Sequence, residues 1–310
     1  MEINGKRIAV LSGGVSNERE ISILSGENVL KALKGEGLEA VKIDVVDEEG
    51  RELKEALRKE RIDIGFIALH GRYGEDGGIQ SFLERLSIPY TGSGVIASAT
   101  CFNKYTAKQV LVAGGISTPP FYLVTGENYS EEEIRNLGFP VVVKPCSGGS
   151  TIGTSIARDE GNVKKAIATA FEHDSSVLIE KYIAGKEITV SIMGNHKPQV
   201  LPIIEIVPKQ EFYNYVAKYE PGMSEHILPA RLTPEKKKEA EEMGMLTYGM
   251  LGCRGFARVD MIAGNDGTIH VLETNTVPGL TETSLFPEAA QAAGITFGKL
   301  CRKLLEMVDE

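Results

Sequence analysis

The sequence contains no apolar run that approaches the ~18 residues needed to cross a lipid bilayer. Residues 1–7 lead directly into a strand pattern rather than into the hydrophobic region of a signal peptide. Cysteine is scarce: the four cysteines are scattered and form no C-x-x-C pair, which argues against a structural zinc site and against a disulfide framework. These absences predict a cytoplasmic protein that has no membrane partner.

Positive charge is in deficit. The sequence contains 34 Lys and Arg residues and 43 Asp and Glu residues, so the formal net charge is −9. Broad nucleic-acid binding needs a concentrated basic surface, so we expect no nucleic-acid partner. Any polyanionic ligand must instead be held by a local cluster of Lys and Arg. The remaining composition is ordinary for an α/β protein, and 310 residues are enough for two or three lobes that share a cleft.

A dinucleotide-binding fingerprint is also missing. Residues 7–11 have the pattern of a buried strand, followed by Gly13 and Gly14 and by a helical pattern that extends to Leu33. α/β proteins bind ligands with this succession of strand, glycine turn and helix, but G-x-G-x-x-G is absent. The two glycines are equally consistent with a tight turn that needs small residues. An NAD-dependent dehydrogenase is therefore a poor alternative.

Two strand patterns separated by a turn lie near the C-terminus, at residues 256–262 and 270–275. Residues i and i+2 of a strand point to the same face of a sheet. Each pattern therefore presents two polar side chains on one face: Arg258 and Asp260 from the first, Glu273 and Asn275 from the second. Mg²⁺ prefers carboxylate and amide oxygens, so the hairpin is a candidate magnesium site.

The pairing register of this hairpin decides whether the four side chains meet. A loop centred on Asn265 and Asp266 would place Arg258 opposite Glu273, with Asp260 diagonal to Glu273. A slip of one residue would put the two sets on opposite faces. A solvent-facing Arg–Glu pair without a metal is the alternative.

Two further strand patterns end in charged residues. The first covers residues 61–69 and delivers His70 into a glycine-rich loop, where a functional role and an ordinary loop role are both open. The second covers residues 139–143 and ends in Lys144, before a loop rich in glycine and hydroxyl side chains. Backbone N–H groups of such a loop can fold over phosphates, although a surface hairpin has the same pattern. The loop is not a Walker A motif, which would open a helix with Gly-Lys-Ser/Thr.

Three other segments have patterns that indicate their structure or role less specifically. Residues 95–113 have the pattern of one helix, which carries Lys104. Residues 176–193 suggest two strands joined by an acidic linker, which resembles a hinge over an adenine pocket but equally fits an ordinary connection. Residues 209–229 show no clear period and contain several tyrosines. A segment of that length inside a compact protein is usually functional or disordered, and we expect a closing lid.

Eight short stretches carry a collective pattern, in one order along nearly the whole chain: residues 13–20, 69–77, 89–94, 143–150, 179–181, 213–219, 255–260 and 273–281. Together they resemble the ATP-grasp superfamily and, more narrowly, its D-alanine:D-alanine ligase family. The resemblance implies an α/β fold with three lobes, in which an N-terminal Rossmann-like parallel sheet is followed by two lobes that clamp ATP. These lobes would span residues 1–94, 95–186 and 187–310.

The resemblance also implies a reaction. ATP would phosphorylate the carboxylate of one D-alanine, and the amine of a second D-alanine would attack the acylphosphate to give D-alanyl-D-alanine for peptidoglycan precursors. ATP is then a co-substrate and two Mg²⁺ ions are the cofactors, for which Mn²⁺ can substitute. A homodimer is the implied assembly.

Residue roles follow from the same resemblance. The metal ligands would be Asp260, Glu273 and Asn275. The ATP-binding residues would be Lys104, Lys144, Glu180, Lys181, Ile183, Glu187 and Lys218. The catalytic residues would be Glu18, Ser150, Tyr219, Arg258, Gly279 and Ser284, with His70 and Leu285 binding substrate. In this scheme Glu18 takes the ammonium of the first D-alanine, and Arg258 with the Gly279 N–H neutralises the oxyanion.

Some features leave other activities open. Gly148 stands where the family commonly has an acidic flap residue, which could loosen the flap. The runner-up activity is a D-alanine:D-lactate ligase or another carboxylate-amine ligase. Members that make the D-lactate ester lack the lid tyrosine, so Tyr219 favours the dipeptide. A non-catalytic nucleotide-binding protein on the same scaffold would need neither the three metal ligands nor Arg258.

Overall fold

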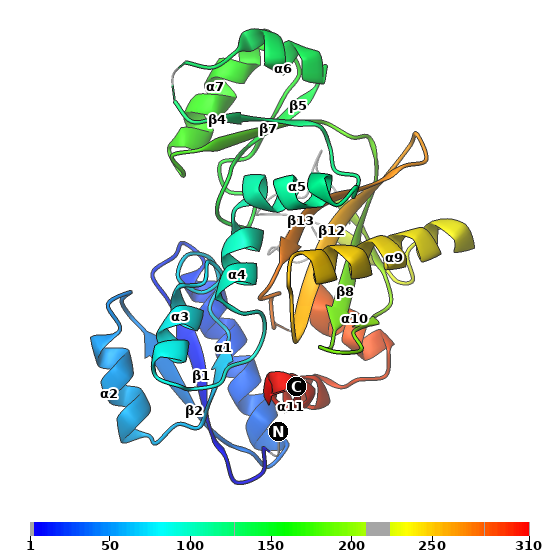
Figure 1. Cartoon of the computed structure of the whole chain (residues 1–310). Helices are drawn as coiled ribbons and strands as arrows, with labels where there is room; N and C mark the ends of the chain where they lie inside the picture. The colour runs from blue at the N-terminus through cyan, green and yellow to red at the C-terminus, as the bar shows by residue number, and fades with distance from the viewer. Residues whose placement is uncertain (1–2, 127, 209–223, 282, 310) are drawn as a thin grey trace.

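The computed structural model of the chain describes residues 3–126, 128–208, 224–281 and 283–309. Its strands form three sheets, which lie along the molecule from the N-terminal sheet to the small sheet that carries α6 and α7 (Figure 1). The sheets contain strands from residues 7–67, 121–181 and 185–275. This mixed α/β architecture confirms the predicted fold class. The lobe boundaries at residues 94 and 186 remain a prediction.

The first sheet is parallel and has the strand order β2-β1-β3. Its strands are β1 (Arg7–Gly13), β2 (Glu39–Val45) and β3 (Ile64–Ile67), with helices α1 (Arg19–Gly35), α2 (Arg51–Lys59) and α3 (Gly78–Arg85). Strand β1 is buried on both faces, which is why its sequence is a continuous apolar run. The carboxyl ends of β1 and β3 deliver the loops that carry Glu18 and His70.

The small sheet is antiparallel, with the order β4-β7-β5-β6. It consists of β4 (Phe121–Val124), β5 (Val141–Pro145), β6 (Ser155–Ala157) and β7 (Val177–Lys181). Helices α6 (Glu131–Leu137) and α7 (Glu160–Phe171) bury one face in a separate apolar core. Both helices begin at a side-chain cap, Ser130 and Asp159 respectively.

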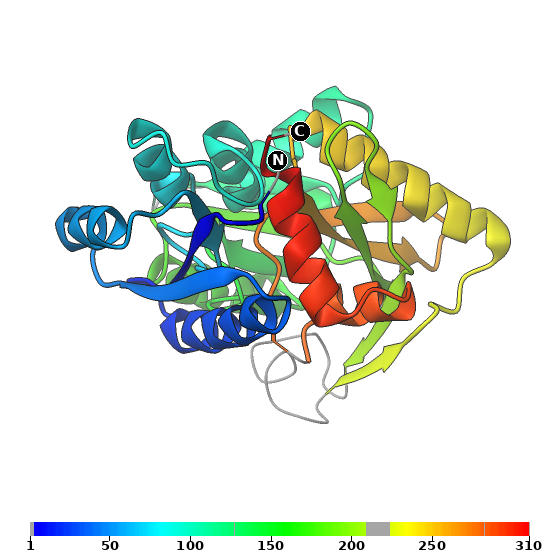
Figure 2. The ribbon, with the colours of Figure 1, turned by 90° about the horizontal axis from the view of Figure 1, so that it is seen from below.

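The third sheet is the largest and is also antiparallel. Its strands are β8 (Gly185–Met193), β9 (Gln199–Val200), β10 (Ile204–Pro208), β11 (Ser224–Ile227), β12 (Phe256–Gly264) and β13 (Ile269–Asn275). One face packs on α5 (Lys104–Ala113) and α9 (Pro234–Met250). The C-terminal helices α10 (Leu285–Ala292) and α11 (Phe297–Glu306), followed by a short 3-10 turn (Met307–Asp309), share a core with β1 and α1, so the chain returns to the first sheet (Figure 2).

The expected single helix over residues 95–113 is wrong in one respect. The structure has two helices, α4 (Val95–Phe102) and α5, separated at Asn103. The Asn103 side chain accepts a hydrogen bond from the Thr106 N–H and so caps α5, because an asparagine in extended conformation satisfies a free donor of the next helix. The break makes Lys104 the first residue of α5.

The β12–β13 hairpin forms, but the expected register is wrong. Arg258 lies opposite Asn275, and Asp260 lies opposite Glu273. The pairing shifts between Asp260 and Met261, because β13 contains one extra residue, Leu272, at a β-bulge. Without the bulge, the pairing nearer the loop would send Glu273 to the opposite face from Asp260. The bulge therefore brings all four polar side chains to one face.

Within the ranges that the structure describes, no helix is both long and apolar enough to cross a membrane.

Candidate active site

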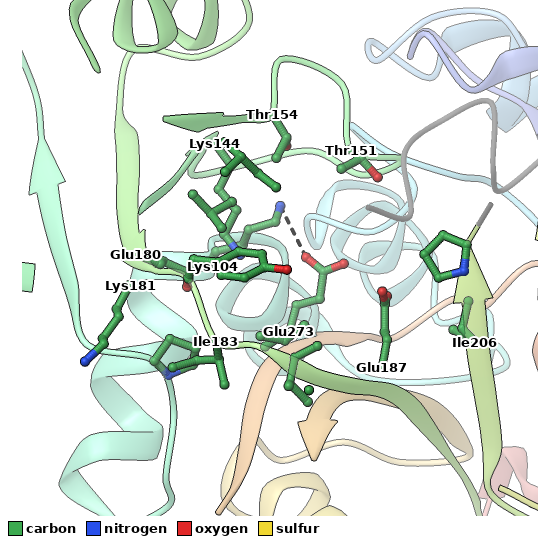
Figure 3. A pocket seen from close by; sticks show the side chains of 18 of the residues that line it. Lys104, Lys144, Thr151, Thr154, Glu180, Lys181, Ile183, Glu187, Ile206 and Glu273 are labelled. Carbon is green, nitrogen blue, oxygen red and sulfur yellow. Dashed lines mark ion pairs between the residues drawn. The ribbon is translucent and has the colours of Figure 1, made fainter. Parts of the chain in front are cut away.

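A cavity with a volume of about 430 Å³ lies between the two antiparallel sheets. The small sheet supplies Val142, Lys144, Ile156 and Glu180, and the large sheet supplies Glu187, Ile206, Ile262 and Glu273. Figure 3 shows Lys104, Glu187 and Glu273 facing a common space, whereas the ammonium of Lys181 extends away from it. The apolar walls and the polar end of this cavity suit a ligand with a flat apolar part and an anionic part.

Two charged residues, Lys144 and Glu180, belong to the wall of this cavity, and Lys108 lies behind them. Glu180 pairs through one oxygen with Lys144 at 2.6 Å and through the other with Lys108 at 2.5 Å. Burial raises the pKa of Glu180, but the charges of Lys108 and Lys144 outweigh burial and lower it below its ordinary value. Lys144 and Glu180 were predicted, whereas Lys108 was missed. The only signal for Lys108 is its place four residues after Lys104 on the same helix.

The loop between β5 and β6 forms a flap over the polar end of the cavity. Lys104 Nζ donates to the Gly148 carbonyl at 2.5 Å and lies 3.8 Å from Glu273 Oε2, which is the ion pair drawn in Figure 3. The Ser150 hydroxyl donates to the Glu18 carboxylate of the first lobe. The flap therefore contacts α5 through Lys104 and the start of α1 through Glu18, and it encloses the space next to Lys104.

A smaller cavity of about 90 Å³ adjoins the first. Gly149 and Glu273 line both cavities, so the two meet at the flap and at β13. The smaller cavity brings together predicted residues from segments that are far apart in the sequence: Glu18, His70, Ser150, Arg258, Asn275, Gly279, Ser284 and Leu285.

His70 and Glu75 form the first-lobe wall of the smaller cavity. The buried His70 ring lies 3.1 Å from Ser25 Oγ through Nε2 and 3.9 Å from Glu75 Oε1 through Nδ1. Burial raises the pKa of Glu75, although His70 and the Gly71 N–H oppose that shift. Glu75 was not among the predicted site residues. Its place in the same glycine-rich loop, five residues after His70, is the signal that could have found it.

The candidate metal ligands lie together on the polar face of β12 and β13. Both Asp260 oxygens accept from Arg258, at 2.9 Å each, and Oδ1 also accepts from the Thr189 hydroxyl at 2.6 Å. Asn275 Oδ1 accepts from the Val277 N–H at 2.9 Å. Asp260 is buried beside Arg258, whereas the Glu273 side chain is 30% exposed on the cavity wall.

These oxygens fit Mg²⁺ by their chemistry, since two carboxylates and a carboxamide are hard ligands. Over the described part of the chain, however, no group of three His, Cys, Asp or Glu residues is arranged to hold a metal by itself. Mg²⁺ commonly takes only one or two protein carboxylates and completes its shell with substrate phosphates and water. The site therefore fits a metal that arrives with a phosphorylated ligand.

The turn before α10 places two further predicted residues. Ser284 begins α10, and its hydroxyl lies 2.7 Å from the Thr281 hydroxyl and accepts from the Thr281 N–H at 3.1 Å. A Cβ atom on Gly279 would lie 2.7 Å from Ser284 Oγ. A side chain at position 279 would therefore displace the Ser284 hydroxyl in the smaller cavity.

Two predicted residues, Lys218 and Tyr219, lie outside the described residues. The expected lid began at Lys209 and ended at Pro229, but residues 224–227 form strand β11, which pairs with β10. The lid interpretation of residues 209–223 stays a prediction.

The chain matches two family models. The model "D-ala D-ala ligase C-terminus" covers residues 110–306, and "D-ala D-ala ligase N-terminus" covers residues 46–93. The D-alanine–D-alanine ligase of Pelotomaculum thermopropionicum is 48% identical over an alignment of 313 positions, which covers 98% of this chain and 97% of the relative. That of Carboxydothermus hydrogenoformans is 48% identical over 306 residues, with 96% and 97% covered.

A solved structure is similar throughout its length. It is the D-alanine–D-alanine ligase from Bacillus anthracis complexed with ATP, which has a TM-score of 0.86 and 38% sequence identity and covers 98% of this chain and 97% of that chain.

Proposed function

The chain belongs to the D-alanine–D-alanine ligase family, and we propose that its two adjoining cavities perform the two halves of one ATP-dependent ligation. The enzyme joins two D-alanine molecules with ATP. The observation that carries the division of labour is the position of Glu273 and Gly149, which line both cavities. A phosphoryl group at this junction would contact the nucleotide side and the amino-acid side at once.

ATP occupies the larger cavity in this proposal. Glu180, Lys181 and Ile183 surround the adenine, and Glu187 receives the ribose hydroxyls. Lys104, Lys144 and the flap backbone hold the phosphates, with Lys218 contributing from outside the described residues. The supporting observation is that Lys104 and Lys144 both line this cavity and that Lys104 also donates to the flap at Gly148. Cationic groups there offset the charge of a polyphosphate in a protein of net charge −9.

Two Mg²⁺ ions, or Mn²⁺ in their place, accompany the nucleotide in this proposal, held by Asp260, Glu273 and Asn275. When bound, they neutralise charge on the phosphate oxygens and so assist phosphoryl transfer. Arg258 is placed beside the same ligands and shares the Asp260 carboxylate. It therefore stays in position whether or not the phosphates are present.

The first half-reaction phosphorylates a carboxylate. Glu18 holds the ammonium of the first D-alanine, with His70 beside it, and the D-alanine carboxylate oxygen attacks the γ-phosphorus. The bond from that phosphorus to the bridging oxygen breaks, and ADP takes the electron pair. Little covalent chemistry is required of the protein, so positioning and charge neutralisation supply the catalysis.

The second half-reaction forms the peptide bond. Ser284 and Leu285 hold the carboxylate of the second D-alanine, whose amine attacks the acyl carbon. Arg258 and the Gly279 N–H stabilise the oxyanion, which collapses as phosphate leaves with its bonding electrons. Ser150 donates to Glu18 in the structure, and Tyr219 would extend this chain to remove the amine proton.

Phosphate release from the purified protein tests this function. With ATP and Mg²⁺, we expect release that depends on D-alanine and not on L-alanine or glycine, with D-lactate poor as a second substrate. Absence of D-alanine-dependent release would contradict the proposal. Because ATP is a co-substrate, we place the reaction in the cytoplasm. The homodimer implied by the resemblance is tested by light scattering.

A further inference from the structure

Lys108 is a buried cation that the proposed function does not use. It lies on α5, and its side chain is only 1% exposed, compared with 10% for Lys144. Lys144 is part of the wall of the larger cavity, whereas Lys108 lies behind that wall. Both ammonium groups contact the same carboxylate, that of Glu180, one on each oxygen. The two lysines thus share Glu180 as their partner, but only Lys144 is accessible to a ligand in the cavity.

The position of Lys108 is fixed on every side. Its Nζ donates to the Thr118 hydroxyl, which in turn donates to the Val271 carbonyl of β13 at 2.7 Å. The Phe121 ring of β4 lies 5.5 Å from the same ammonium. The pKa of Lys108 is lowered to about 8, chiefly by burial and also by the charge of Lys144, against the opposing charges of Glu180 and Glu273. A buried lysine charge destabilises the folded protein unless well-placed partners offset the desolvation free energy.

We infer that Lys108 is a positioning residue of the nucleotide site, the permanent counter-ion of Glu180 that leaves Lys144 available for a nucleotide phosphate. One carboxylate balances two lysines before the nucleotide binds. When phosphates enter, Lys144 can turn toward them, and Glu180 keeps a partner. Without Lys108, the same movement would leave Glu180 as an unpaired buried anion, so the phosphates would compete with Glu180 for Lys144.

This inference rests on the proposed function. It differs from a purely structural role of Lys108 in the quantity that a substitution would change. A structural ion pair would lower the stability of the fold and reduce the amount of active enzyme. A counter-ion for Glu180 would raise the KM for ATP, leave kcat and the KM for D-alanine nearly unchanged, and act only while residue 180 is charged. The second pattern depends on the partner, so a pair of variants can detect it.

The experiment compares steady-state kinetics of Lys108→Met, Glu180→Gln and the double variant with the wild type. We expect Lys108→Met to raise the KM for ATP roughly 30-fold or more, the usual scale when one partner of a buried charge pair is removed. In the Glu180→Gln background, the same substitution should change the KM for ATP by less than about twofold. Lys42→Met, which removes a surface lysine paired with Glu27, is the matched control.

The outcomes are decisive in either direction. A wild-type KM for ATP in folded Lys108→Met would overturn the inference while leaving the ligase activity intact. A further large loss in the double variant, beyond Glu180→Gln alone, would also overturn it. If Lys108→Met does not fold, the double variant still decides, because it contains no unpaired buried carboxylate. Loss of D-alanine-dependent turnover in the wild type would instead count against the proposed function.

Discussion

The two cavities differ in how the chain builds them and in the charge that they present. The larger cavity is made mainly of strand side chains and has lysines at its closed end. The smaller cavity is made mainly of loop residues and a helix start, and it contains the carboxylates of Glu18, Glu75 and Glu273. The first arrangement favours a polyanion, and the second favours a ligand with an ammonium group. The comparison explains how one acidic protein can bind ATP and two zwitterions side by side.

A substitution of Glu273 should affect both cavities, because this residue lines both of them. Replacing it with glutamine removes the charge opposite Lys104 and one hard oxygen ligand. We expect D-alanine-dependent phosphate release to fall roughly 10²–10³-fold or more. Circular dichroism and thermal unfolding should match the wild type, and Glu27→Gln on the surface of α1 is the control. Wild-type rates in Glu273→Gln would show that the shared wall is not the reacting centre.

Gly279→Ala should disturb the smaller cavity alone. The added Cβ would lie 2.7 Å from Ser284 Oγ, so the Ser284 hydroxyl must move. We expect kcat/KM for D-alanine to fall between about tenfold and 10²-fold, with the KM for ATP unchanged. Gly249→Ala is the control, since a Cβ there would contact nothing within 4 Å. An equal effect on ATP would mean that the two cavities do not act separately.

The pH dependence should sharpen the contrast on the nucleotide side. The pKa of Lys108 is about 8, so its charge is present below that pH and is lost above it. Glu180, Lys144 and Glu273 are the charged groups that act on it. We expect kcat/KM for ATP to fall about tenfold from pH 8 to pH 9.5, since it reports groups of the free enzyme. Lys108→Arg, which stays charged, should flatten this decline; an identical profile in that variant would remove Lys108 from the explanation.

Tyr219→Phe should produce the smallest change and should alter the product rather than the rate. The substitution removes the hydroxyl group of Tyr219 and so weakens the proposed proton chain with Ser150 and Glu18. The intact chain favours an amine as the second substrate. With D-alanine and D-lactate together, we expect the ratio of ester to dipeptide to rise about threefold or more. Mass spectrometry of the products measures the ratio, with Tyr122→Phe on the small sheet as the control. An unchanged ratio would exclude Tyr219 from the choice of product.

Local backbone geometry predicted some of the residues of each cavity. Strand alternation places Glu273 and Asn275 on one face, and strand ends locate Lys144, because these follow from local backbone geometry. The bulge at Leu272 was invisible, since an extra residue in a strand has no side-chain signature of its own. The strand patterns also place Arg258 beside Glu273 and Asn275, whereas only the resemblance added the loop residues of the smaller cavity.

Lys108 and Glu75 show a second limit. A lysine four residues after another lysine on a helix has the pattern of an exposed face, yet Lys108 is buried, where it pairs with Glu180. Glu75 is buried because its loop folds back, so that the Gly71 N–H donates to its carboxylate at 2.9 Å. The partner of Lys108 comes from the tertiary fold and that of Glu75 from a local turn, and neither burial is visible in the sequence pattern.

Transfer of ¹⁸O from substrate to phosphate tests the central claim most directly. The enzyme is supplied with ATP, Mg²⁺ and D-alanine labelled in both carboxylate oxygens, and the released phosphate is analysed by mass spectrometry. If the carboxylate attacks the γ-phosphorus at the junction of the two cavities, each phosphate carries one labelled oxygen and the new peptide carbonyl keeps the other. Unlabelled phosphate beside labelled dipeptide would contradict a phosphorylated carboxylate, and with it the proposed division of work between the two cavities.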